Sequence, residues 1–235
     1  MLDGRVALVT GGSGGIGAAI VSSLTAAGVR VAASYRGGAD RAKSTTAALT
    51  VQADVADPAA CERLVDEVER ELGPVEVLVA NAGAGERRTL DEVTLDEFDH
   101  AYAVNLRAPW LLAKRTIPGM RERGFGRVLF TSSVAAFTGG IVGPHYAASK
   151  AGLHGLTHFL AAREAANGIT VNALAPALIE DTLMLPGDPG DLAQRIPVGR
   201  LGRPEEVADL ALAVLKNAYI TNQVLGIDGG MHPRG

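Results

Sequence analysis

The chain has 235 residues, of which 47% are hydrophobic and 20% charged. This composition excludes a disordered or fibrous protein and is long enough for a sizeable core. The net charge is −4, and a glutamate interrupts the densest basic run, Arg121, Arg123 and Arg127, so we expect no nucleic-acid or anionic membrane partner. One cysteine, Cys61, excludes an internal disulfide, and the residue spacing of a zinc site is missing, so no metal is expected.

The start of the chain passes from MLDG straight into the apolar run VALVT, which is not the pattern of a signal peptide. No stretch reaches the roughly 18 consecutive apolar residues of a membrane span. We therefore expect a soluble, cytoplasmic protein.

Short apolar runs alternate with helical patterns throughout the chain. The runs are continuously apolar, which is typical of parallel strands that are covered on both faces. The strands are predicted at residues 5–10, 29–35 and 49–55, and in runs that begin at residues 75, 126, 168 and 223. This β-α alternation predicts an α/β fold, with one doubly wound, mostly parallel seven-stranded sheet of the Rossmann type in a single domain, residues 1–235.

The helices between these runs have recognisable ends. Asp57-Pro58 predicts an N-cap followed by proline at the first helical position, and Gly73 predicts the end of that helix. Thr94 and Glu97 form a capping box, which predicts the start of a long helix.

The glycine cluster GGSGGIG, residues 11–17, follows the first predicted strand and opens a helix expected at about 15–27. Glycines let the backbone approach a pyrophosphate, and a helix N-terminus offers unpaired N–H groups and a positive dipole. The cluster in this context predicts dinucleotide binding. Two spacings fit, namely G-x-G-x-x-G through Gly12, Gly14 and Gly17, and G-x-x-x-G-x-G through Gly11, Gly15 and Gly17.

The stretch YAASK, residues 146–150, places Tyr146 and Lys150 on one face of a helix. Such a pair alone is most often an ordinary helix surface. A tyrosine pKa of about 10 is too high for efficient proton transfer at neutral pH, and a nearby ammonium lowers that pKa because it favours the phenolate. The other interpretation is therefore a proton donor beside the cation that tunes it.

Several motifs together decide between these interpretations. They resemble, in order and spacing, the short-chain dehydrogenase/reductase family, and the ending YITNQVLGIDGGM is similar to its 3-oxoacyl-acyl-carrier-protein reductase branch. The resemblance favours the second glycine spacing, because Thr10 and Ile16 stand at family positions. The motifs are TGGSGGIG, ADV (53–55), NAG (81–83), VN (104–105), SS (132–133), YAASK and VNALAP.

The resemblance implies that Ser133, Tyr146, Lys150 and Asn105 are the catalytic residues. Tyr146 would be the general acid in reduction, while Lys150 would hold the nicotinamide ribose and lower the pKa of Tyr146. Ser133 would hydrogen-bond the substrate carbonyl; Ser132, its neighbour, faces the other way along a strand. Asn105 would lie at a helix distortion that binds a water and links Lys150 to solvent, and the alternative is a solvent-facing polar residue.

The resemblance also implies a cofactor site. Asn81 would fix the central strand and face the cofactor, Asp54 and Val55 would flank the adenine, and Ile179 would contact the nicotinamide carboxamide through its backbone. The full expected set is Gly11, Ser13, Gly14, Gly15, Ile16, Gly17, Arg36, Asp54, Val55, Asn81, Ala82, Gly83, Tyr146, Lys150, Pro176, Ile179 and Thr182.

Cofactor choice depends on the end of the second strand. NAD-binding chains of this fold generally have an acidic residue there, whereas a 2′-phosphate favours arginine. Here the strand ends Ser34-Tyr35-Arg36 and no carboxylate follows until Asp40. We therefore predict NADP rather than NAD, with Arg36 on the phosphate; the alternative is a loop arginine in solvent.

The leading prediction is an NADP(H)-dependent carbonyl reductase of fatty acid biosynthesis that reduces a 3-oxoacyl thioester to the 3-hydroxyacyl form. Asn167 stands where carrier-dependent reductases often have an arginine, although Arg121 and Arg123 could supply positive charge for a carrier-bound substrate. One alternative is a dehydrogenase or reductase of another small alcohol or ketone, of sugar, steroid or polyketide type. The remote alternative is a catalytically silent dinucleotide-binding sensor.

Two further expectations concern the surroundings of the site. Residues 182–197 are predicted to form a short substrate lid, because Met184 and Leu185 are flanked by glycines and prolines. The helices around 94–117 and 146–165 would, by the resemblance, pack across a dimer, and the assembly would be a homotetramer or a dimer.

Overall fold

The structure is a computed structural model that describes residues 2–182 and 189–232. One seven-stranded sheet forms its centre, with the strand order β3-β2-β1-β4-β5-β6-β7 and every neighbouring pair parallel. The predicted α/β, Rossmann-type single domain is therefore confirmed. The strands are β1 (Val6–Thr10), β2 (Arg30–Tyr35), β3 (Leu49–Gln52), β4 (Val77–Ala80), β5 (Gly126–Thr131), β6 (Ile169–Pro176) and β7 (Val224–Ile227).

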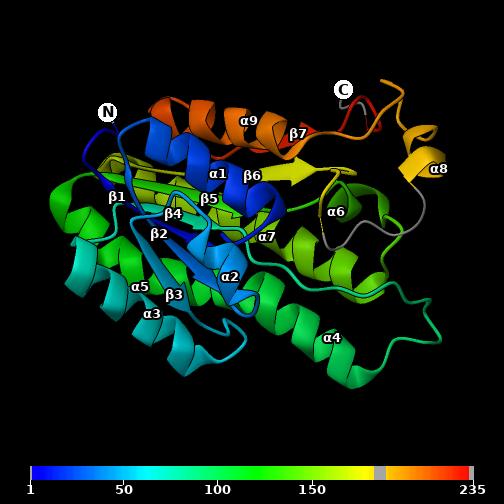
Figure 1. The fold of residues 1–235 in the computed structure, drawn as a ribbon, viewed down its shortest axis with the longest axis horizontal. Helices are drawn as coiled ribbons and strands as arrows, with labels where there is room; N and C mark the ends of the chain where they lie inside the picture. The colour runs from blue at the N-terminus through cyan, green and yellow to red at the C-terminus, as the bar shows by residue number, and fades with distance from the viewer. Residues whose placement is uncertain (1, 183–188, 233–235) are drawn as a thin grey trace.

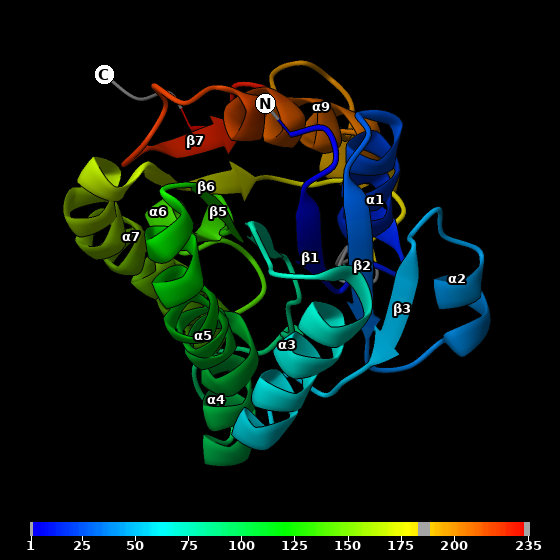
Figure 2. The same cartoon turned by 90° about the vertical axis from the view of Figure 1, so that its left-hand side faces the viewer.

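Helices cover both faces of the sheet (Figures 1 and 2). The helices α1 and α9 pack together over one face, and α3, α5 and α7 share the core of the other face. The helices are α1 (Gly15–Ala26), α2 (Ala39–Lys43), α3 (Pro58–Leu72), α4 (Leu95–Tyr102), α5 (Ala108–Arg123), α6 (Ala135–Thr138), α7 (Pro144–Glu164), α8 (Pro189–Ala193) and α9 (Pro204–Lys216), with a π-helical turn η1 (Ala103–Arg107) and a 3-10 turn η2 (Ala165–Asn167).

Burial of the strands agrees with their apolar sequences. Every residue of β1, β4, β5 and β6 is buried, as expected for parallel strands between two helical layers. The third strand is shorter than the predicted 49–55 and ends at Gln52. The carboxylate of Asp54 accepts a hydrogen bond from the backbone N–H of Ala56 (3.0 Å), which turns the chain out of the sheet.

Capping residues define the helices as predicted. The Asp57 carboxylate accepts a hydrogen bond from the N–H of Ala59 (2.9 Å), and Thr94 and Glu97 form the reciprocal capping box. The long helix predicted after Thr94 continues through α4, η1 and α5, with the π-helical turn between its two α-helical parts.

The sheet places a crevice at the carboxyl ends of β1 and β4. The chain proceeds outward from β1 to β2 and β3, and then returns to continue on the other side of β1 with β4. In open parallel sheets, ligands bind where the strand order reverses in this way. The glycine cluster follows β1, and Asn81 follows β4 at the same edge.

Candidate active site

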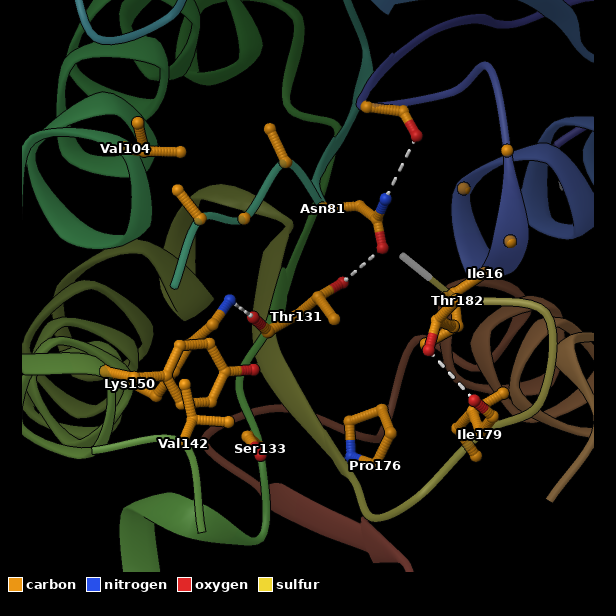
Figure 3. A pocket seen from close by; sticks show the side chains of 18 of the residues that line it. Ile16, Asn81, Val104, Thr131, Ser133, Val142, Lys150, Pro176, Ile179 and Thr182 are labelled. Atoms are coloured by element: carbon orange, nitrogen blue, oxygen red, sulfur yellow. Dashed lines mark hydrogen bonds between the residues drawn. The ribbon is translucent and has the colours of Figure 1, made fainter. Parts of the chain in front are cut away.

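A cavity of about 730 Å³ opens at the carboxyl ends of the strands (Figure 3). Every residue predicted to bind the cofactor lines it, and so does Ser133. Ile16 and Thr182 lie together on one side, and Lys150 and Ser133 lie on the other. Asn105 alone of the predicted site residues is not part of the lining.

Four glycines of the cluster cannot be replaced without strain. Gly11 and Gly15 have φ +65° and +50°. A Cβ on Gly17 would lie 2.0 Å from the carbonyl oxygen of Gly11, and a Cβ on Gly12 would lie 2.8 Å from the Cβ of Ala33. A Cβ on Gly14 would meet open space. Because Gly15 belongs only to the second spacing and Gly14 only to the first, the geometry favours the second spacing.

The N-terminus of α1 is suited to an anion. No side chain caps it at Gly14, and no acidic residue stands in its first turn. Its N–H groups and dipole therefore face the cavity without a protein carboxylate to satisfy them. The carbonyl oxygen of Asp181 and the Cγ2 of Thr182 each lie 3.3 Å from a Cβ built on Gly15, so Thr182 reaches this turn. These features fit the pyrophosphate of a dinucleotide.

Asn81 joins the strand ends below the cavity. Its Nδ2 donates to the carbonyl oxygens of Thr10 (3.2 Å) and Gly11 (3.3 Å), and its Oδ1 accepts from the Thr131 hydroxyl (3.2 Å). This side chain therefore fixes the ends of β1, β4 and β5 relative to one another, as the sequence predicted.

Two arginines line the cavity near the end of β2. Arg36 follows that strand directly and Arg41 lies on α2; both side chains are exposed. Asp40 is not part of the lining. The sequence interpretation missed Arg41, since only the short helix α2 brings it back over the end of β2.

Ser133, Tyr146 and Lys150 form one buried cluster. Their exposed fractions are 9%, 7% and 2%. The Lys150 ammonium donates to the carbonyl oxygen of Thr131 (2.6 Å) and lies 5.7 Å from the centre of the Tyr146 ring. Ser133 hydrogen-bonds Tyr146, so hydroxyl, phenol and ammonium lie at one place.

The two serines of SS have different partners. The Ser132 hydroxyl donates to the carbonyl oxygen of Lys150 (3.0 Å) and lies 2.9 Å from Nε2 of His154. The Ser133 hydroxyl instead accepts from the N–H of Ala135 (3.2 Å) and meets Tyr146. This difference favours Ser133 as the residue that meets a ligand.

Burial controls the protonation of this cluster. It raises the pKa of the Tyr146 phenol, although the hydrogen bond from Ser133 acts in the opposite direction. Burial also lowers the pKa of Lys150 to about 8. The expectation of a lowered tyrosine pKa is therefore corrected for the protein alone, because burial disfavours the charged phenolate.

Asn105 lies in the π-helical turn η1 and is completely buried. Its Oδ1 accepts from the N–H of Ala84 (2.8 Å), and its Nδ2 donates to the Ala84 carbonyl (2.8 Å) and the Ser149 hydroxyl (2.9 Å). The solvent-facing alternative is wrong, and the expected helix distortion is present. Since the side-chain amide already hydrogen-bonds Ala84 and Ser149, a water at this residue would have to donate to the backbone carbonyl of Asn105.

Several lining residues were not found from the sequence. Four of them are apolar and one is a cation. No local pattern marks them, because they come from loops and from the end of the chain, which only the tertiary fold brings together. They are Ile141, Val142, Leu178, Met231 and the cation Arg195.

Two kinds of site are absent from the described ranges 2–182 and 189–232. Neither range contains a group of three or more His, Cys, Asp or Glu residues arranged to hold a metal ion. Within the same residues no helix combines the length and the hydropathy needed to cross a membrane.

Comparison with known proteins agrees with this geometry. A family model described as short chain dehydrogenase matches residues 5–189. An acetoacetyl-CoA reductase from Shinella zoogloeoides is 40% identical over 235 residues, which cover 96% of this chain and 98% of the relative. The 3-oxoacyl-acyl-carrier-protein reductase FabG from Escherichia coli (strain K12) is 37% identical over 240 residues, with 98% of each chain covered.

A solved structure gives the same comparison in three dimensions. A blue fluorescent protein from a metagenomic library, in complex with NADPH, has a TM-score of 0.92 and 36% identity to this chain. The alignment covers 99% of each chain.

Proposed function

The chain belongs to the short-chain dehydrogenase family, and on that premise we propose that it reduces a 3-oxoacyl thioester to the 3-hydroxyacyl form with NADPH. Its family and relatives make it an oxidoreductase that binds a nicotinamide dinucleotide and acts on C=O or CH–OH groups of a small molecule. The observation that carries the proposal is one cavity that contains both the glycine turn and the cluster of Ser133, Tyr146 and Lys150.

The three residues have complementary roles in this proposal. The bound nicotinamide supplies a hydride to the carbonyl carbon. Ser133 donates a hydrogen bond to the carbonyl oxygen and holds it where negative charge develops. Tyr146 gives its proton to that oxygen, which completes the alcohol.

Lys150 supports the proton transfer. A pKa of about 8 leaves it mostly an ammonium at neutral pH. The positive charge favours the phenolate that Tyr146 becomes when it loses its proton, and the hydrogen bond to Thr131 fixes the side chain. Asn105 holds the loop at Ala84 against Ser149 of α7, and its backbone carbonyl is the proposed site of the water that returns a proton.

The proposed substrate class is supported by the two relatives, one named for acetoacetyl-CoA and the other for a carrier-bound 3-oxoacyl group. A carrier protein as partner stays a prediction. Arg121 is engaged by Glu164 (2.7 Å), and Arg123 donates to the Val75 carbonyl (3.2 Å), so neither cation is free of protein partners.

NADPH is the proposed cofactor because two cations, Arg36 and Arg41, line the cavity at the end of β2. An arginine there matches a 2′-phosphate, whereas NADH would leave it without a ligand charge. The NADPH in the related blue fluorescent protein supports this choice.

A panel experiment tests substrate and cofactor together. The wild-type protein is mixed with NADPH or NADH and with acetoacetyl-CoA, an acetoacetyl carrier protein, and ketones of sugar, steroid and polyketide type, and loss of the reduced nicotinamide is followed by absorbance. We expect the highest kcat/KM for an acetoacetyl thioester with NADPH. A higher kcat/KM for another ketone would replace the substrate class, and no turnover with any substrate would favour a dinucleotide-binding sensor.

The homo-oligomer and the lid remain proposals. Large hydrophobic side chains are exposed on α4, α5 and α7, namely Phe98, Trp110 and Phe159, and burial of these across a two-fold axis would form the proposed dimer or tetramer. Analytical ultracentrifugation tests this assembly, and a monomer would contradict it. Of the proposed lid at 182–197, residues 183–188, with Met184 and Leu185, lie outside the described residues. The cytoplasmic location stays a prediction.

A further inference from the structure

We propose that Arg195 binds an anionic group of the substrate, a phosphate or a carboxylate, on the carboxyl or thioester side of the reacting carbonyl. This inference rests on the proposed function, because it concerns the far part of the same substrate. Arg195 follows α8, its side chain is exposed, and it lines the cavity.

The guanidinium of Arg195 is available to a ligand. Within residues 2–182 and 189–232, it makes no hydrogen bond and no ion pair. Arg200, on the same segment, is instead paired with Glu206 (Nη2 to Oε1, 2.6 Å). Five N–H donors with no protein acceptor, at the wall of a cavity, are suited to an external anion.

The backbone beneath Arg195 is anchored. Leu192, Ile196 and Leu201 are buried in a small core of their own. The N–H of Arg195 donates to the Leu192 carbonyl (3.1 Å), and the N–H of Val198 donates to the Gly229 carbonyl (3.1 Å). The side chain is therefore presented from a packed segment.

The packing also places Arg195 at the substrate part of the cavity. Ile141, Leu178 and Met231 pack against the small core under Arg195 and also line the cavity. Arg36 lies instead at the end of β2, four strand positions from β6 in the sheet. At about 4.8 Å for each position, this separation is roughly 19 Å. Because Leu178, which packs against the core under Arg195, comes shortly after the end of β6, we assign Arg195 to the substrate and not to a phosphate on the adenosine ribose.

The surroundings of Arg195 leave its guanidinium available to an anion of the substrate. Asp181 also lines the cavity, but it makes no ion pair with Arg195 among the described residues. The apolar lining residues would contact the acyl chain on one side of the reacting carbonyl, and the guanidinium would meet a charge on the carboxyl or thioester side. A guanidinium binds phosphate or carboxylate through two parallel hydrogen bonds. A coenzyme A thioester carries the first group and a free 3-oxo acid carries the second.

The test compares Arg195→Gln and Arg195→Lys with the wild type. The control is Arg30→Gln, which removes an exposed charge at the start of β2, away from the cavity. The substrates are acetoacetyl-CoA, acetoacetate, and the uncharged thioester of acetoacetate with N-acetylcysteamine. We expect Arg195→Gln to raise KM about tenfold for a charged substrate, with little change for the uncharged one, and Arg195→Lys to restore part of the loss. The control should leave every KM unchanged.

The outcomes separate the possible sources of the anion and the two proposals. If Arg195→Gln raises KM for acetoacetyl-CoA alone, the anion that Arg195 binds is a phosphate. If it raises KM for acetoacetate alone, the anion is the carboxylate. Equal changes for charged and uncharged substrates would overturn the role of Arg195 while leaving the proposed function intact.

If the wild type reduces none of these substrates, the proposed function is overturned. A binding measurement then still tests the anion site at Arg195. Free coenzyme A and acetoacetate are titrated calorimetrically into wild type and Arg195→Gln, each saturated with NADP⁺ to block the cofactor site. About tenfold weaker binding of either anion by the variant supports the anion site, and equal binding of both overturns it.

Discussion

The two ends of the cavity are built in different ways. At the end near α7, Ser133, Tyr146 and Lys150 are buried. Ser133 hydrogen-bonds Tyr146, and Lys150 donates to the Thr131 carbonyl at the end of β5. At the end near β2, Arg36 and Arg41 are exposed side chains on a turn and a short helix. The difference suggests that changes at the α7 end alter the rate of the chemical step, whereas changes at the β2 end alter cofactor affinity.

At the α7 end, a large fall in kcat is expected from Ser133→Ala. Loss of one donor to a developing oxyanion lowers kcat by about 10²–10³-fold, while the dissociation constant for NADPH should stay within about twofold. Steady-state kinetics and a fluorescence titration of NADPH measure the two effects. Ser132→Ala is the matched control. A larger fall in kcat for Ser132→Ala than for Ser133→Ala would mean that Ser132, and not Ser133, donates to the carbonyl oxygen.

At the β2 end, Arg36→Gln should raise KM for NADPH by about 10–100-fold, because a charge-assisted hydrogen bond contributes roughly 1.5–3 kcal/mol. The KM for NADH and the kcat with either cofactor should change little. Arg30→Gln, at the opposite end of the same strand, is the control. Equal losses for the two cofactors would mean that Arg36 does not bind the 2′-phosphate.

A pH profile tests the buried lysine. Since burial lowers the pKa of Lys150 to about 8, kcat/KM for reduction should fall above that pH, by up to about tenfold for each pH unit, as the ammonium becomes a neutral amine. Below about pH 8 the cation is present and the profile should level off. Tyr146 cannot cause this fall, because its pKa is raised and its phenol stays protonated in the same range.

The arginine of Lys150→Arg keeps its charge at these pH values, so the fall in kcat/KM of this variant should move to higher pH. If kcat/KM of this variant falls at the same pH as that of the wild type, the titration of Lys150 does not cause the fall.

The smallest effect is expected from Arg41→Gln, a few-fold rise in KM for NADPH, because α2 holds this side chain less directly over the end of β2. The double variant Arg36→Gln/Arg41→Gln should show a larger rise in KM for NADPH than either single variant. No change in the double variant relative to Arg36→Gln would leave Arg36 as the sole phosphate ligand.

The sequence predicted those parts of the molecule that depend on local rules. Continuous apolar runs predicted buried parallel strands, and Asp57 and Thr94 marked helix starts through caps that the structure contains. Gly15 and Gly17 are needed for backbone reasons alone, so the glycine motif placed the turn correctly. The family resemblance, rather than a local rule, pointed to Ser133, Tyr146 and Lys150, which the fold brings together at one cavity.

Features that depend on tertiary packing could not be predicted in this way. Arg41, Met231 and Arg195 reach the cavity from separate segments, without a motif of their own. The π-helical turn at Asn105 and the amide's bonds to Ala84 depend on a loop distant in sequence. The pKa of Tyr146 was misjudged because a sequence shows the neighbouring cation but not the depth of burial.

Tyr146→Phe tests the central claim most directly, since it removes only the phenolic oxygen from the α7 end. NADPH is first titrated by fluorescence, and a single turnover with acetoacetyl-CoA is then followed by stopped flow. We predict NADPH binding within about twofold of the wild type and hydride transfer slowed by about 10²–10⁴-fold, as loss of a general acid requires. Hydride transfer at the wild-type rate in this variant would contradict Tyr146 as the proton donor.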